Sequence, residues 1–519
     1  MTSRHPHSAS WQATALLAAV SLVVGAVATA QVLPQAPSPS PTSVPLGPPP
    51  SAAYANLPDM GSTANTMISR ADEYQVGRMM VHNLRDEGGV LEDPEATEYM
   101  QNLGSHIGAQ AQEGTQQFSF FIVRDNSVNA FALPGGFIGT NYGLILQTNN
   151  ESELAGVLAH EIGHVVQRHI ARAIHAESRQ SLSTMAAMLG AILIGVAGGG
   201  DAAMGMIAMA QGTAMQQQIN FTRMEESEAD RVGIGFLSAA DFDPNGVASF
   251  FSTMIQLEGP ELYAIPNILK NHPVNTQRIA EARARAAQMP RRPSHRDSPS
   301  YSLIRERVRV LTAATETDLR PYYVRMKANG ADSLAVDYGA ALADIKAGDA
   351  DGAVKTLRRL VDANPGITIL HTALGEAQMA AGQQDDALKT FAHAVELYPR
   401  NVPVTVRYAE ALLKADHPAQ AHQLLLDLFN NAVPTPEQIR LTALAASSAG
   451  DTGDAYYYMA EFHIASGNLM LATQQLDLAL TEPRLTEVQR KRFIARRDEI
   501  RDYLREQRQQ RGGSPTSQR

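Results

Sequence analysis

The sequence predicts an α+β fold in which a mainly helical domain with a small β-sheet is followed by an all-α array of helix pairs. Apolar residues recur at helical spacing along much of the chain, and two apolar segments between residues 118 and 138 have the composition of strands. Alanines recur every 34 residues in the C-terminal half. The chain has 519 residues, of which 44% are hydrophobic and 18% charged, so it can bury two or three cores.

Charge and cysteine content exclude several classes of function. The chain has 53 acidic and 43 basic residues, a net charge of -10, so the electrostatic attraction of a basic protein for nucleic acid is missing and we expect no nucleic-acid partner. The absence of cysteine excludes disulfides, a thiolate zinc site, a cysteine nucleophile and a lipid-modified cysteine. Any metal must therefore be bound by histidine and carboxylate.

The N-terminus has the pattern of a secretory signal. Arg4 precedes an uncharged apolar run from about Ala13 to Val27, and residues 28–30 have the small-x-small form of a signal-peptidase site. We expect residues 1–30 to be cleaved off near Ala30 and the mature protein to be periplasmic. An uncleaved anchor is the alternative, although the run is shorter than the roughly 20 residues of a spanning helix.

A proline-rich segment and a first globular domain follow. Residues 31–62 contain nine of the 28 prolines, which predicts an extended, disordered linker. The first domain is predicted over residues 63–290 and begins with helices near 68–84 and 94–111.

The next elements are predicted to be a small sheet and a long helix. Residues 118–124 predict one strand, and residues 129–138 predict a second strand broken by a turn. A helix is expected from about Asn150, with Glu153 in capping-box position and apolar residues at helical spacing up to Val166.

A linker at residues 291–302 precedes a second domain, predicted to be helical over 303–508 and followed by a disordered tail at 509–519. Four alanines lie 34 residues apart, and glycine turns precede three of them at a constant interval. These alanines are Ala353, Ala387, Ala421 and Ala455. This pattern resembles the tetratricopeptide repeat, whose helix pairs form a solenoid with a concave groove. A generic helical bundle is the alternative.

The most informative motif is His160-Glu161-Ile162-Gly163-His164. Two histidines four residues apart project from the same face of a helix, so both imidazoles can reach one zinc ion. Glu161, rotated by about 100° from His160, can lie beside the metal in the position of a general base. Two buried, hydrogen-bonded histidines without a metal are the alternative.

A third zinc ligand is expected from Glu225-Glu226-Ser227-Glu228-Ala229-Asp230. Glu226 and Asp230 share one helix face, so one carboxylate can complete the zinc coordination while the other accepts the free N–H of a ligating histidine. Glu228 is expected on a solvated face of the helix.

Together these motifs resemble the HtpX-like HExxH zinc metallopeptidases, of the gluzincin type, and among them the BepA-type periplasmic proteins with a tetratricopeptide tail. The resemblance covers almost all of the mature chain and also rests on residues 129–136 and 272–279. It implies one zinc ion per chain, with Glu161 as the base and Asp230 as a residue that contacts a zinc ligand rather than the zinc itself. The zinc ligands that it implies are His160, His164 and Glu226.

The resemblance implies two further roles near the active helix. An edge strand would lay out an extended substrate through backbone pairing, with a purely structural hairpin as the alternative; its candidate residues are Phe131, Ala132, Leu133, Gly135 and Gly136. We also hypothesise that His272 occupies the fourth zinc position and keeps the enzyme latent. Arg278 would steady the His272 loop or the oxyanion.

Two Met- and Ala-rich apolar runs, 185–197 and 202–210, lie between the ligand-bearing helices. Both are shorter than the roughly 20 residues needed to cross a bilayer, so we expect a hairpin. It could act as a movable lid, touch a lipid or protein surface, or be an ordinary buried hairpin.

Three functional hypotheses follow. The leading one is a periplasmic zinc endopeptidase that degrades misfolded or stalled envelope and outer-membrane proteins, with the repeat domain docking substrates or the outer-membrane assembly machinery. The second is a chaperone or adaptor that acts through the repeat groove while the protease site is mostly latent. The third, a membrane-integral protease, needs an uncleaved signal and an inserted hairpin.

Overall fold

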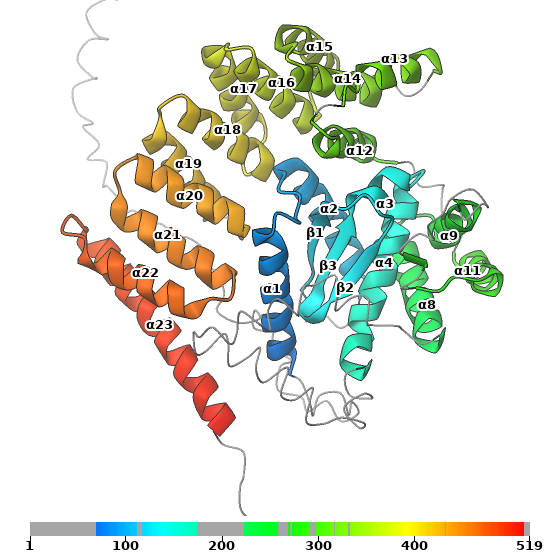
Figure 1. Ribbon diagram of the computed structural model, residues 1–519, viewed down its shortest axis with the longest axis horizontal. Coiled ribbons are helices and arrows are strands. Elements are labelled where there is room, and N and C mark those ends of the chain that lie inside the picture. Colours follow the sequence, from blue (N-terminus) through cyan, green and yellow to red (C-terminus); the bar gives the residue numbers. More distant parts are fainter. Residues whose placement is uncertain are drawn as a thin grey trace, which may run out of the picture. The chain divides into compact units, whose positions relative to one another are not determined.

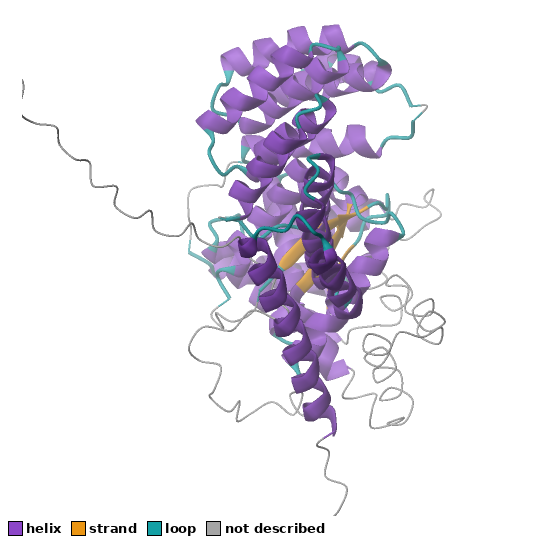
Figure 2. Cartoon of the chain, turned by 90° about the vertical axis from the view of Figure 1, so that its left-hand side faces the viewer, coloured by secondary structure: helices purple, strands orange, loops and turns teal. Residues whose placement is uncertain are grey.

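Helices form almost all of the regular structure, with one three-stranded sheet among them (Figure 2). The computed structural model describes residues 69–111, 117–173, 223–257, 268–269, 272–290, 297–315, 317–330, 333–430 and 432–512. The predicted signal, proline-rich linker and Met-rich hairpin lie outside these residues. The α+β prediction is confirmed. Within the described part of the chain, no helix is both long and apolar enough to traverse a bilayer.

The first region contains three strands among its described residues, with helices before and after them. The helices α1, α2 and α4 are each preceded by an N-cap residue, Ser69, Asp93 and Asn150, whose side chain accepts a hydrogen bond from the backbone N–H three residues later. The elements are α1 (Arg70–Asp86), α2 (Pro94–Gly108), β1 (Ser119–Val123), β2 (Ala130–Leu133), the 3-10 helix η2 (Pro134–Gly136), β3 (Phe137–Asn141), α3 (Tyr142–Gln147), α4 (Glu151–Val166), α8 (Arg223–Ala239), α9 (Gly246–Leu257) and α11 (Thr276–Gln288).

The sheet has the order β1-β3-β2, with β1 parallel and β2 antiparallel to β3 (Figure 1). The segment 129–138, predicted as one strand broken by a turn, contains β2 and the start of β3. Gly135 makes the reversal possible because its φ is 79° and an added Cβ would lie 2.4 Å from the Cα of Tyr74 in α1.

Alternating side chains of the strands are buried on both faces of the sheet. On one face, Ile122 and Ile138 join the core cluster that includes Met100 of α2 and Leu158 of α4. On the other face, Phe121 and Phe131 pack in the cluster that includes residues of α1. The sheet is therefore covered by α2 and α4 on one face and by α1 on the other, which explains why its strands are apolar throughout.

The second region consists of successive helices that pack in pairs along the chain (Figure 1). They are α12 (Pro299–Thr312), α13 (Arg320–Ala328), α14 (Ser333–Ala347), α15 (Ala350–Ala363), α16 (Thr368–Ala380), α17 (Gln384–Leu397), α18 (Val402–Lys414), α19 (Pro418–Phe429), α20 (Pro436–Ser448), α21 (Thr452–Ala465), α22 (Leu469–Thr481) and α23 (Glu487–Gly512).

The 34-residue period has a backbone cause. Gly348, Gly382 and Gly450 follow α14, α16 and α20, the first helices of three helix pairs, with φ of 89°, 74° and 80°. Asp416 takes the equivalent position after α18, with φ of 61°. The repeat prediction is confirmed, and the turn geometry recurs even where the sequence departs from glycine.

Two predicted boundaries differ from the helices observed. The helix α12 begins at Pro299, before the predicted domain start at 303, because Ser298 caps it by accepting from the Tyr301 N–H and proline suits the first turn. At the other end, α23 extends to Gly512, past the predicted limit at 508. The remaining residues of the predicted tail, 513–519, lie outside the described part.

Candidate active site

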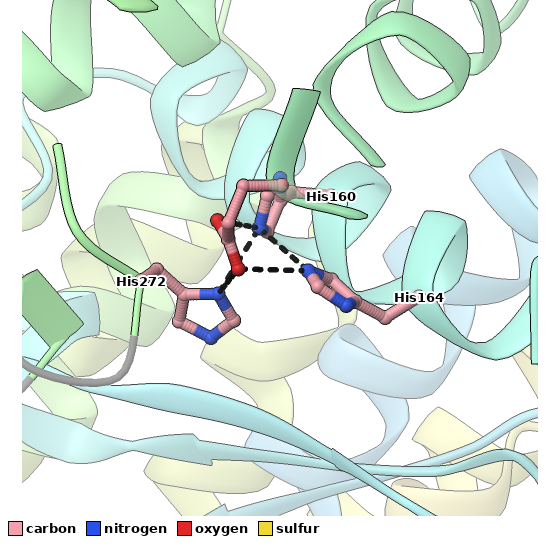
Figure 3. A group of neighbouring side chains, drawn as sticks. His160, His164 and His272 are labelled. Carbon is pink, nitrogen blue, oxygen red and sulfur yellow. Dashed lines mark hydrogen bonds and ion pairs between the residues drawn. The ribbon is translucent and has the colours of Figure 1, made fainter. Parts of the chain in front are cut away.

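The helix α4 presents His160 and His164 on one face, as their spacing predicts. Both are buried, and their Nε2 atoms lie 3.0 Å apart (Figure 3). An imidazole pair this close, with both ring nitrogens facing one point, has the arrangement of two ligands of a single ion.

The helix α8 reaches this pair because two glycines let the backbones of α4 and α8 approach. A Cβ on Gly163 would lie 2.9 Å from the carbonyl oxygen of Ala229, and one on Gly233 would lie 2.8 Å from that of Ala159. The close packing brings Glu226 between the imidazoles. Its Oε2 is 3.5 Å from His160 Nε2, and its Oε1 is 3.5 Å from His164 Nε2.

His272 contributes the fourth side chain from the segment that precedes α11. Its Nδ1 lies 2.9 Å from Glu226 Oε1 and 3.3 Å from His160 Nε2 (Figure 3). Its backbone N–H donates to the carbonyl of Ile268 at 2.8 Å, which fixes the entry of this segment. His160, His164, Glu226 and His272 thus form one buried group.

The donor atoms of this group fit one zinc ion. Tetrahedral zinc with bonds of about 2.0–2.1 Å to nitrogen and oxygen separates its ligand atoms by about 3.3 Å. Five pairs of donor atoms lie 2.9–3.5 Å apart, all four residues offer a ligand atom within 4.8 Å of the others, and the donors are imidazoles and a carboxylate, which zinc prefers. A zinc ion held there would polarise a substrate carbonyl and make a water molecule more acidic.

Glu161 lies beside this group. It is 1% exposed, and neither of its carboxylate oxygens has a hydrogen-bond partner among the described residues. His272 Nε2 lies 3.5 Å from Glu161 Oε1. A buried carboxylate whose lone pairs are not used by hydrogen bonds can accept a proton, as a general base must.

Asp230 and Arg278 contact the side chains of the metal group: Asp230 lies against His160, and Arg278 lies against Glu226. The Nδ1 of His160 lies 2.9 Å from Asp230 Oδ1. Arg278 donates to both oxygens of Asp230, from Nε at 2.6 Å and from Nη2 at 2.9 Å, and its Nη2 is 2.7 Å from Glu226 Oε2. The two carboxylates are therefore held by one guanidinium.

The protonation states of Glu226 and His164 favour cation binding, whereas that of His160 opposes it. Burial acts to raise the pKa of Glu226, but the facing His272 and His160 hold it well below its usual range, so the carboxylate is charged. Burial and the neighbouring His160 and His272 lower the pKa of His164, which stays neutral. Burial also acts to lower the pKa of His160, but its bonds to Asp230 and Glu226 raise it to about 10, so a metal must displace a proton there.

The structure brings together all the predicted residues of the metal group and its supports. The candidate edge-strand residues divide: Phe131, Ala132 and Leu133 lie in β2, whereas Gly135 and Gly136 lie in η2. The sheet lies against α4 through β2, so this strand is close to the helix that carries the two imidazoles.

One pair of residues near the metal group was missed. His169 lies against His164, and Glu228, predicted on a solvated face, has a side chain only 27% exposed that contacts His169 and Arg172. The sequence carried no spacing template for this pair. The only available signal was a third histidine shortly after the HExxH motif.

Comparisons with known proteins agree with this geometry. Residues 94–286 match the model of peptidase family M48, and residues 335–366 and 378–445 match models of the tetratricopeptide repeat. The beta-barrel assembly-enhancing protease of Escherichia coli (strain K12) is 31% identical over 449 residues, which cover 86% of this chain and 91% of that protein.

Two other relatives agree with this result. A putative beta-barrel assembly-enhancing protease of Vibrio cholerae is 32% identical over 451 residues, 86% of this chain and 92% of its own length. The metalloprotease LoiP of Escherichia coli is 27% identical over 238 residues, 43% of this chain and 88% of its own length. Similarity at this level over most of the chain, together with the HExxH group, shows that the chain belongs to the M48 metallopeptidases and carries a C-terminal tetratricopeptide-repeat domain.

Proposed function

We propose that this chain is a zinc endopeptidase of the bacterial periplasm that degrades misfolded or stalled outer-membrane proteins, with the repeat domain docking substrates or assembly machinery. The observation that carries the reaction class is the buried convergence of His160, His164 and Glu226 beside Glu161. The substrate class and compartment rest on the 31% identity, over 86% of the chain, to a protease that enhances β-barrel assembly.

The proposed roles follow from the contacts. His160, His164 and Glu226 hold one zinc ion per chain, and Asp230, whose Oδ1 lies 2.9 Å from His160 Nδ1, orients the ring of His160. Glu161 accepts a proton from the attacking water and later passes it to the leaving amine. Arg278 keeps Asp230 and Glu226 ionised and also donates to the carbonyl of Pro273 at 3.0 Å, which supports a role in steadying the His272 loop.

The substitution Glu161→Gln tests the reaction class. We expect the purified mature variant to keep its zinc and fold but to digest unfolded casein about 10²- to 10⁴-fold more slowly, because the amide cannot accept the proton. Glu92→Gln, an exposed carboxylate that pairs with Arg85, is the control and should leave digestion unchanged.

The alternative, a chaperone or adaptor, predicts a different outcome for the same variant. If Glu161→Gln retained full activity in digestion and in restoring outer-membrane assembly to cells that lack the protein, the enzyme hypothesis would be wrong. Restored assembly with lost digestion would favour the groove as the working part.

We further propose that His272 keeps the site latent. Its Nδ1 is within the distances of a fourth zinc ligand, where a substrate carbonyl or water would otherwise bind. His272→Ala should therefore raise basal casein digestion, with zinc content unchanged. Unchanged or lower digestion by this variant would remove the latency proposal.

The edge strand β2 is proposed to bind an extended substrate. Asn141 N–H donates to Asn129 carbonyl, and bonded pairs alternate along an antiparallel ladder, so the N–H of Ala130 and of Ala132 point away from β3. Ala132→Pro removes one outward N–H without removing a β2–β3 bond. We expect a higher KM for casein with unchanged zinc content, and an unchanged KM would contradict pairing at this edge.

A further inference from the structure

His169 lies directly behind His164, on the side away from the metal group. The two Nδ1 atoms are 2.9 Å apart, the ring centroids are 4.8 Å apart and the rings are nearly perpendicular, at 82°. His169 is 0% exposed. A buried ring nitrogen this close to the ring of a ligating histidine decides which of its nitrogens carries the proton.

The short segment after α4 creates this contact. The helix ends at Val166, and Arg168 has a φ of 51°, so the helical path is interrupted there before residues 169–173 form a further helical turn. Arg168 is anchored to Glu73 of α1 at 2.6 Å. This interruption places His169 against His164, whereas a continued helix would have carried it to another face of α4.

Proton positions along this contact have one arrangement that is compatible with a metal. The Nε2 of His164 faces His160 and Glu226, so its lone pair must be free for the cation and its proton must be on Nδ1. That N–H points at His169 Nδ1, which must accept. If His169 Nδ1 donated to His164 Nδ1 instead, the proton of a neutral His164 would be on its Nε2 and would block metal binding.

Glu228 completes the arrangement. Because His169 accepts through Nδ1, its proton is on Nε2, and this atom lies 3.2 Å from Glu228 Oε2. The same oxygen accepts from Arg172 Nη1 at 3.0 Å. The chain of donors therefore runs from His164 through His169 to a carboxylate whose charge is balanced by a guanidinium.

We propose that His169 is a positioning residue that holds His164 in the tautomer and orientation required of a zinc ligand, with Glu228 fixing the tautomer of His169. The inference rests on the zinc peptidase function proposed above. It assigns separate supports to the two ligand histidines: Asp230 contacts His160 directly, whereas the carboxylate behind His164 acts through a second imidazole.

The test compares His169→Phe with His169→Asn in the Glu161→Gln background, where self-digestion cannot interfere. Phenylalanine keeps a ring but removes the acceptor, whereas the asparagine Oδ1 falls near the position of the lost Nδ1 and can accept from His164. We expect zinc affinity, measured by chelator competition, to fall about 10- to 100-fold in His169→Phe and to be largely retained in His169→Asn.

Two controls accompany this comparison. His106→Phe removes an exposed histidine of the same domain, which contacts the carbonyl of Ala240, and should leave zinc affinity unchanged. Glu228→Ala should lower zinc affinity by a smaller factor than His169→Phe, and it carries the test if His169→Phe does not fold. Side-chain ¹⁵N spectra of the zinc-loaded parent should show His169 protonated on Nε2.

The outcomes separate the two proposals. Equal losses in His169→Phe and His169→Asn, or wild-type affinity in the folded phenylalanine or Glu228→Ala variant, would overturn the positioning role and leave the zinc peptidase intact. A parent protein that binds no zinc would overturn the proposed function, and this inference with it.

Discussion

Two groups of histidine and carboxylate side chains in this protein look alike in composition but differ in how their polar atoms are used. The first is the HExxH group of His160, His164, Glu226 and His272, and the second is the repeat group of His422, Asp451 and Asp454. In each group the nearest donor atoms lie within 4.8 Å of one another. Composition and proximity therefore do not distinguish them.

The carboxylates of the repeat group are already used by other donors. Gln489 Nε2 donates to Asp451 at 3.0 Å and to Asp454 at 3.0 Å, Arg492 pairs with Asp454, and Asp451 caps α21 through the Asp454 N–H. The Nε2 of His422 is 3.7 Å from Asp454 and has no hydrogen-bond partner among the described residues. In the HExxH group Arg278 also contacts Glu226, but three imidazoles and the Glu226 carboxylate approach one another at 2.9–3.5 Å, so the geometry supports a metal there and a structural role for the repeat group.

The largest expected difference between the groups is in zinc binding. Glu226→Gln should cost more zinc affinity than the roughly 10- to 100-fold that the loss of an outer contact costs, because it removes a ligand. Asp454→Asn, its counterpart in the repeat group, should keep zinc content unchanged. Zinc content by elemental analysis, with circular dichroism as the check on folding, measures both; a loss of zinc in Asp454→Asn would erase the distinction.

A smaller effect is expected from the helix contact that assembles the first group. Gly163→Ala places a methyl 2.9 Å from the Ala229 backbone oxygen, so it should separate α4 from α8, cost about 1–3 kcal/mol of unfolding free energy and weaken zinc binding. Gly235→Ala, on α8 with nothing within 4 Å of the added Cβ, should stabilise by up to about 1 kcal/mol. Urea denaturation measures both, and equal effects would contradict close packing as the cause.

The smallest effect concerns His422. Burial lowers its pKa below the ordinary value of 6.5, despite the facing Asp454 and Asp451, and Arg492 also acts to lower it. The unfolded chain therefore takes up this proton near pH 6.5 while the folded state does so only at lower pH, so stability is lost as the pH falls below 6.5. His422→Phe should make the loss shallower, as thermal unfolding at pH 5 and 7 would show, with zinc unchanged. An unaltered pH dependence would mean that His422 is not buried in the neutral form.

The sequence was most informative where a spacing maps directly onto one helix. His160 and His164 are four residues apart on α4, and the 34-residue period reproduces the helix pairs, because in both cases local geometry carries the pattern. The sequence alone offered Glu226 or Asp230 as the third ligand, and only the family resemblance selected Glu226. The close approach of α4 and α8 could not be predicted, since it depends on Gly163 and Gly233 meeting backbone across the interface.

The remaining features depend on backbone φ angles that cannot be predicted from the residue type alone. One predicted strand became β2 and β3 because Gly135 adopts a positive φ. His169 was missed because Arg168, a residue type that rarely adopts positive φ, interrupts the helical path after α4. Without that turn, a continued helix would place His169 on a different face from His164.

Anomalous diffraction at the zinc edge from crystals of the purified mature protein tests the central claim most directly. We expect one strong peak per chain, about 2.0–2.2 Å from His160 Nε2, His164 Nε2 and an oxygen of Glu226. A map without a peak between these side chains, or with its strongest peak beside His422, would contradict it.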